Sequence, residues 1–241
     1  MKQADLEQLE KVNFFYNRGA ETTRLETFVD AAFAFALTLL VISFDAVPAS
    51  YDELVNALRA IPAFLLGFAV LMMFWAAHRK WLIRFGLDTT TAMMISLVLV
   101  FVILVYVYPL RAMSTAAVSA MTNGWLPTIF VVTSVDQVRG LFGIYGSGFV
   151  LCSACIVALN AHALSLRKSL SLTAEELFLT RTELGGWLVV ASIGLLSILM
   201  AFTVPDGLVG LSGWIYLSLP VVMPIFRWQV SRRFDEQVKE T

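Results

Sequence analysis

Residues 24–42 read RLETFVDAAFAFALTLLVI, a run in which the carboxylate of Asp30 interrupts an otherwise apolar pattern after Phe28. The spacing of Thr23 and Glu26 matches a capping box, which predicts that a helix begins at Thr23. A carboxylate about two turns into an apolar helix is costly to expose to lipid, so it needs a partner, water or a cavity. The stretch therefore predicts a membrane-spanning helix that carries a functional polar residue.

The composition of the whole chain supports a membrane protein. Of its 241 residues, 59% are hydrophobic and 15% are charged, and the mean hydropathy is +0.78. Soluble domains carry roughly 25% charged residues. The net charge of −1 gives no basic field for nucleic acid. We therefore expect lipid, and not nucleic acid, as the surrounding partner.

Six apolar stretches are long enough to cross a bilayer core, which takes about 20 helical residues. Helices are expected because they satisfy their own backbone hydrogen bonds in lipid, and the runs lack the alternation of barrel strands. This predicts an all-α, polytopic membrane protein with one domain over residues 1–241, an N-terminal segment over 1–22 and a tail over 228–241. The predicted spans are 28–47, 58–77, 92–113, 141–164, 184–204 and 208–226.

The basic residues predict the orientation. Fourteen of the seventeen lie in the N-terminal segment, the loops after the second and fourth spans, and the C-terminal tail. The opposite side holds Arg111 and Arg139, and Arg59 lies near a boundary. By the positive-inside rule both termini are expected in the cytoplasm, which requires an even number of spans and places the chain in the cell membrane.

The residue types that usually carry catalysis do not form a recognisable motif. His78 and His162 fall in separate predicted spans, so they cannot form a metal-ligand pair within one helix turn. Cys152 and Cys155 have redox spacing but lie in an apolar run without an electropositive neighbour. We expect no enzyme, no metal and no cofactor, and favour a protein that moves a solute.

The first predicted helix has one continuous apolar stripe. At 100° per residue, Asp30 is expected on the far side of the helix from this stripe, together with Ala34, Leu37 and Val41. Taken alone, such a stripe is more typical of helix packing than of a pore lining. Its members are Arg24, Phe28, Ala31, Phe35, Thr38, Leu39 and Ile42.

The second predicted span offers partners for Asp30. In an antiparallel pair of helices, Trp75 and His78 reach similar depths on one face, so the Trp75 indole N–H could donate to Asp30. His78 would then lie near the depth of Arg24. The alternative is an aromatic-belt tryptophan beside a histidine at the membrane boundary, and without other information this is the more typical arrangement.

Together these residues resemble the signature of the transmembrane protein 175 family, the potassium channels of lysosomes and their bacterial relatives. In that family the first helix begins Arg-x-x-x-Phe-Ser-Asp and continues into an apolar, threonine-containing lining. Arg24, Phe28 and Asp30 match that opening, and Val29 replaces its serine. The second helix of the family ends in a Trp-x-x-His sequence, which Trp75-Ala-Ala-His78 matches.

The resemblance implies a function and an assembly. Bacterial members have one six-span repeat and form homotetramers, in which four first helices surround a pore that conducts potassium. We expect potassium as the permeant cation here, with the proton as a second candidate. The implied lining positions are Phe35, Thr38, Leu39 and Ile42, and Phe35 stands where the family has an aliphatic residue at its narrowest point. The implied polar network is Arg24, Phe28, Asp30, Trp75 and His78.

A proton-coupled or other secondary transporter is the alternative function, with Asp30 and His78 as the titrating pair. Transporters place such charges near the midplane and on broken helices. The first span has no internal glycine or proline and Asp30 is off-centre. We therefore rank a passive channel with a hydrophobic constriction first.

Overall fold

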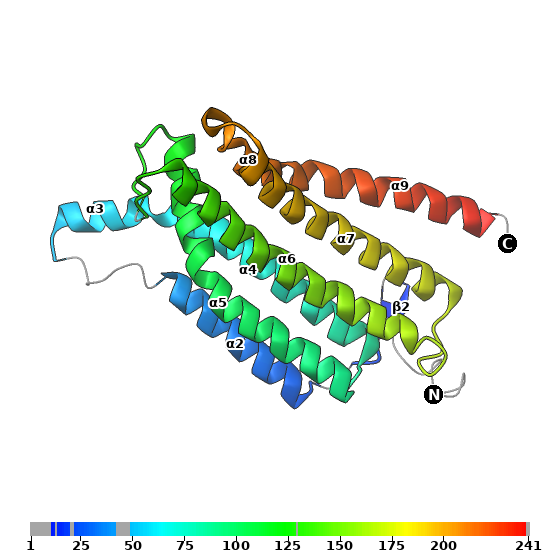
Figure 1. Cartoon of the computed structure of the whole chain (residues 1–241). Coiled ribbons are helices and arrows are strands. Elements are labelled where there is room, and N and C mark those ends of the chain that lie inside the picture. Colours follow the sequence, from blue (N-terminus) through cyan, green and yellow to red (C-terminus); the bar gives the residue numbers. More distant parts are fainter. Residues whose placement is uncertain (1–10, 13, 20–21, 42–48, 129, 240–241) are drawn as a thin grey trace.

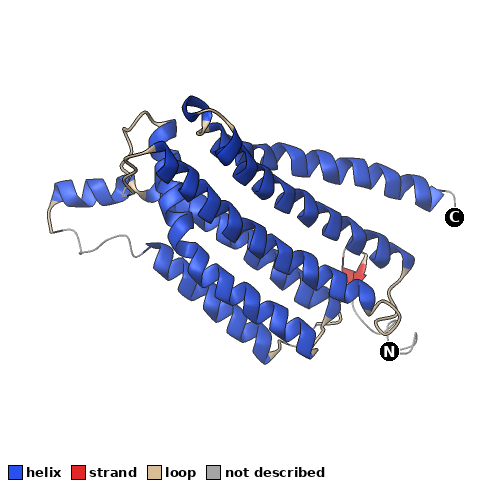
Figure 2. Ribbon diagram, viewed as in Figure 1, coloured by secondary structure: helices blue, strands red, loops and turns tan. Residues whose placement is uncertain are grey.

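The computed structural model describes residues 11–239 except 13, 20–21, 42–48 and 129. The described chain is helical apart from loops and one short antiparallel pair, β1 (Lys11–Val12) and β2 (Phe15–Tyr16), which confirms the all-α prediction (Figure 2). The α-helices are α2 (Arg24–Val41), α3 (Tyr51–Arg59), α4 (Ile61–Phe85), α5 (Thr90–Met121), α6 (Val135–Ser165), α7 (Ala174–Thr203), α8 (Leu211–Trp214) and α9 (Leu219–Lys239). Two short 3₁₀ turns, Asp206–Leu208 and Ile215–Ser218, flank α8.

Among the described residues, five segments are long and apolar enough to cross a membrane, and each overlaps one of the predicted spans. The remaining predicted span, 28–47, overlaps α2, and its last part lies outside the described residues. The five segments are Tyr51–Phe85, Thr90–Met121, Val135–Ser165, Ala174–Thr203 and Asp206–Val230.

The long helices form one bundle in which consecutive members run in opposite directions (Figure 1). Helix α2 packs against α4 and α5, α6 packs against α5 and α7, and α9 runs along α7. The strands β1 and β2 lie at the same end of the bundle as the last turns of α9. Helix α2 therefore lies at the edge of the bundle, with a neighbour on one side only.

Small residues allow the central helices to approach closely. A Cβ atom at Gly146 would lie 2.5 Å from Ile198 Cγ1 of α7, and one at Gly148 would lie 2.3 Å from Tyr106 Cδ2 of α5. Both distances are well below van der Waals contact. These glycines therefore set the spacing of α6 against its two neighbours, as small residues do in membrane bundles.

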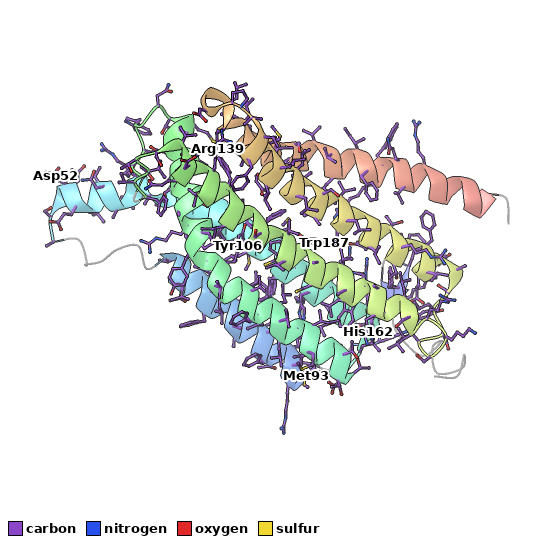
Figure 3. All side chains as sticks on the ribbon, viewed as in Figure 1. Asp52, Met93, Tyr106, Arg139, His162 and Trp187 are labelled. Atoms are coloured by element: carbon purple, nitrogen blue, oxygen red, sulfur yellow. The ribbon has the colours of Figure 1, made fainter. Side chains whose placement is uncertain are left out.

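Helix α3 is an element that the sequence did not predict. Ser50 caps it by accepting a hydrogen bond from the Glu53 backbone N–H at 3.2 Å. The helix projects from the bundle at the end opposite β1 and β2, and Asp52 lies at its outer edge (Figure 3). The connection after α5, in contrast, contains no helix among its described residues before Val135.

A buried ion pair fastens the N-terminal segment to α7. Arg18 donates to both carboxylate oxygens of Glu176, at 2.6 and 2.8 Å, and the two side chains are 4% and 0% exposed. The backbone N–H groups of Tyr16 and Thr173 also donate to this carboxylate, each at 3.0 Å. On the N-terminal side, this ion pair involves only the segment that leads into α2. The spacing of Arg18 and Glu176 along the chain did not predict it.

A second attachment joins the same segment to α4. The Gly19 backbone N–H donates to the Ile83 carbonyl at 3.0 Å. A Cβ atom at Gly19 would lie 2.4 Å from the Leu82 carbonyl oxygen, so this close approach requires glycine. Together the two attachments fix where the chain enters α2.

Candidate pore-lining face of α2

Helix α2 begins where the sequence predicted. Thr23 Oγ1 accepts a hydrogen bond from the Glu26 backbone N–H at 3.1 Å, and the first helical residue is Arg24. This cap satisfies one of the free N–H groups at the start of the helix. It also fixes the rotation of the faces that follow.

The two sides of α2 differ sharply in exposure. The buried side consists of Val29, Phe33, Ala36 and Leu40, each at most 3% exposed. Phe28 and Phe35 on the other side are 52% and 56% exposed. The full set of exposed residues on the described helix is Arg24, Thr27, Phe28, Ala31, Ala34, Phe35, Thr38 and Val41.

The exposed face is wider than the predicted stripe, and it corrects part of that prediction. Ala34 and Val41 are exposed, although they were expected on the far side with Asp30. At 100° per residue the exposed arc spans roughly 140°, because α4 and α5 both cover the helix from one side. Asp30 and Leu37 are half-buried at the border of this arc.

The four predicted lining residues differ in position. Phe35 and Thr38 lie on the exposed face. Leu39 is half-buried and packs against the core, so it lies at the edge of the face. Ile42 lies outside the described residues. The Thr38 hydroxyl donates to the Ala34 carbonyl of the preceding turn at 3.0 Å.

Asp30 has a partner on α4. The indole N–H of Trp75 donates to Asp30 Oδ1 at 2.8 Å, which is the hydrogen bond considered from the sequence. The Arg79 guanidinium lies 5.7 Å from the centre of a Trp75 ring, within the range of a cation–π interaction. Trp75 thus connects the carboxylate on α2 with a cation on α4.

His78 has a different partner from the one expected. It is 1% exposed, and its Nε2 lies 2.9 Å from the Ser96 hydroxyl of α5. Arg24 and Phe28 are exposed on α2, and Arg24 makes no side-chain ion pair or hydrogen bond within the described part of the chain. His78 therefore lies against α5, and no hydrogen bond joins it to Arg24 among the described residues. A single serine in an apolar run offered no signal for this contact.

The Asp30–Trp75 pair gives a stability prediction. In a double-mutant cycle of Asp30→Asn and Trp75→Phe, we expect a coupling free energy of about 1.5 kcal/mol, since hydrogen bonds to charged groups contribute about that much or more. Thermal unfolding of the four purified proteins in one detergent measures it. Strictly additive effects of the two substitutions would show that the pair does not stabilise the fold.

Comparison with known proteins places these features in a wider context. Residues 24–109, from the start of α2 into α5, match the family model described as endosomal/lysosomal potassium channel TMEM175. The chain is 30% identical to a potassium channel of Marivirga tractuosa over 223 aligned residues. The alignment covers 89% of each protein.

Two solved structures are similar in fold. One is a variant of the potassium channel MtTMEM175 in complex with a Nanobody-MBP fusion protein; it has a TM-score of 0.78 and 27% identity, with 92% of this chain and 98% of that chain covered. The other is a lysosomal potassium-selective channel TMEM175 homolog from Chamaesiphon minutus, with a TM-score of 0.52 and 21% identity over 86% and 96% of the two chains. The second likeness supports the fold alone.

Proposed function

The chain belongs to the TMEM175 family of potassium channels, and we propose from this premise that four copies of it surround a pore lined by α2. It is a channel and not an enzyme, because the family and the relatives are ion channels. The observation that carries the pore assignment is the exposed apolar face of α2. One side of the helix is fully buried, and Phe28 and Phe35 on the other side are more than half exposed, which leaves that side free to face a pore or a neighbouring copy.

The width of that face supports an assembly of several copies. A helix that lines a central pore meets the pore along the middle of its face and neighbouring copies along the edges. The small residue Ala34 lies near one edge of the exposed arc and suits a close contact with a neighbouring copy, while Phe35 and Thr38 lie within the same arc. Closed rotational symmetry around the pore then buries every copy of the face equally.

The proposed topology has six spans, with α2 as the first and both termini in the cytoplasm of a cell-membrane protein. The antiparallel order of the long helices and the common end of β1, β2 and α9 support an even number of spans. The positive-inside distribution of basic residues supports the orientation.

Conduction in this proposal depends on a short apolar constriction. Four Phe35 rings exclude water from one level of the pore, and Thr38, Leu39 and Ile42 line the next levels. A potassium ion crosses when its lost hydration is partly replaced by the Thr38 hydroxyl oxygens. Behind this face, the Asp30–Trp75 pair holds α2 against α4, and the His78–Ser96 pair joins α4 to α5.

Those same pairs argue against the carrier alternative. A proton carrier with Asp30 and His78 would need the two groups to exchange protons with each other or with a water path. Asp30 instead accepts from Trp75, and His78 is buried against Ser96. The comparisons favour the channel over the carrier as well.

Two measurements test the proposal. Native mass spectrometry of the purified protein in detergent should give a complex of four chains. The same preparation in planar bilayers should give resolvable single-channel potassium currents, whereas a carrier transports too slowly for single-molecule currents to be resolved. A monomeric protein would contradict the pore, since one copy supplies a single lining helix.

A further inference from the structure

Three basic side chains converge at the end of the bundle that holds β1 and β2. Lys80 and Arg84 of α4 both approach Glu183 of α7: Lys80 donates a hydrogen bond to Oε1, and an Arg84 guanidinium nitrogen lies 3.5 Å from the same atom. Arg227 of α9 is close enough to interact electrostatically with all three. We refer to Lys80, Arg84 and Arg227 as the basic cluster.

The charges in this cluster do not balance. Three cations share one carboxylate, that of Glu183. The next carboxylate that acts on Arg84 is Glu176, and Arg18 already binds both of its oxygens. Counting Arg18 and Glu176, four cations face two carboxylates among the described side chains, which is an excess of two positive charges. A partly buried excess of this size favours an additional anion.

The cluster reaches the surface of the bundle. The Lys80 side chain is 41% exposed and Arg227 is exposed, whereas the Arg84 side chain is 17% exposed. Cations thus reach the surface from two helices, α4 and α9, with a third cation behind them. An anion can reach the cluster without any rearrangement of the bundle.

Exposed apolar residues accompany the cluster on α9. Ile225 and Trp228 lie within two residues of Arg227 along the chain and are 49% and 53% exposed. The Arg232 guanidinium lies 3.9 Å from the centre of a Trp228 ring. Tryptophan and arginine in this arrangement are typical of the boundary between hydrocarbon and headgroups. A ligand with a negative head and a hydrocarbon tail matches both parts of this surface.

We propose that the basic cluster binds the phosphate of an anionic membrane lipid, whose acyl chains lie against α9. Basic pockets between membrane helices are recognised sites for anionic headgroups. The exposed apolar residues beside the cluster favour a lipid over a free phosphate, which would gain nothing from them. The site is separate from the pore face of α2, and its test does not depend on conduction.

The site also contacts the segment that leads into α2. The Arg84 guanidinium lies 4.0 Å from the centre of the Phe15 ring, and the neighbouring Ile83 accepts the hydrogen bond from Gly19. A bound headgroup therefore holds the cytoplasm-side end of α4 in the position that anchors this segment.

The test compares lipid binding by variants of the purified full-length channel in detergent. Phosphatidylglycerol and phosphatidylcholine are titrated separately, and bound lipids are counted by native mass spectrometry. Arg227→Gln removes one cation that is exposed, so the fold should be unaffected. We expect it to weaken phosphatidylglycerol binding about fivefold and to leave phosphatidylcholine binding unchanged, as one basic residue near an anionic headgroup contributes that much.

Arg167→Gln is the matched control, because it removes one exposed positive charge from the same end of the bundle, in the loop before α7. It should leave phosphatidylglycerol binding within a factor of two. If both variants weakened phosphatidylglycerol binding equally, the effect would come from general surface charge, and the proposed lipid site would be wrong. Displacement of the lipid by millimolar glycerol phosphate would overturn its assignment to a lipid and leave a soluble anion as the ligand.

Discussion

Replacing Phe35 with alanine is expected to raise potassium flux through the channel about tenfold or more. The phenyl ring is 56% exposed in the single chain, on the face of α2 proposed to line the pore. Four such rings at one level exclude water, so an ion crossing them loses hydration without a replacement. Lowering this barrier by about 1.4 kcal/mol raises a rate tenfold. Potassium flux from proteoliposomes with equal amounts of protein measures the change.

Leu37→Ala is the control for this prediction, since Leu37 is two residues away, half-buried and packed against the core. We expect this variant to lose up to about 2 kcal/mol of stability, because a leucine that is only partly buried loses less than one in a core. Its flux per folded channel should stay close to that of the wild type. Raised flux in Leu37→Ala with unchanged flux in Phe35→Ala would place the lining on the other side of α2.

The second large effect is expected from Arg18→Gln. This change leaves the Glu176 carboxylate, which is fully buried, without its charged partner. Removing one member of a buried ion pair costs about 3 to 5 kcal/mol, because the remaining charge is neither solvated nor neutralised. We expect the free energy of unfolding to fall by this amount. Thermal unfolding in detergent is the measurement.

Lys11→Gln provides a matched comparison on the same two elements. Lys11 pairs with Glu175, the residue next to Glu176, at 2.9 Å, but both side chains are more than one third exposed. An exposed ion pair contributes at most about 1 kcal/mol. If Arg18→Gln were no more destabilising than Lys11→Gln, the buried pair would not be what fastens the N-terminal segment to α7.

The long helices could be predicted from the sequence because each signal lies within one segment. A run of apolar residues and a cap such as Thr23 act locally, so the spans were found without knowledge of the neighbours. Helix α3 was missed because its apolar residues are interleaved with charges over nine residues, too short a stretch for a span. The register of Trp75 with Asp30 could be estimated because two antiparallel helices fix relative depth.

The contacts that cross between distant elements could not be predicted in the same way. Arg18 and Glu176 are 158 residues apart, and the three helices around Glu183 meet only once the bundle has formed. Helix periodicity placed Phe35 and Thr38 on one face, but the width of that face depends on how α4 and α5 cover α2. Ala34 and Val41 were misplaced for this reason.

The hydrogen bond from Thr38 to its own helix affects whether cations or anions can pass through the proposed pore. Because the hydroxyl proton is given to the Ala34 carbonyl, the oxygen turns only its lone pairs outward. In the proposed tetramer a ring of such oxygens offers acceptors and no donors. A cation finds partial ligands there, whereas chloride meets four electron-rich atoms and nothing to bind it. In the proposed pore, the orientation of the Thr38 hydroxyl protons therefore excludes anions. No ring of carboxylates is required for this exclusion.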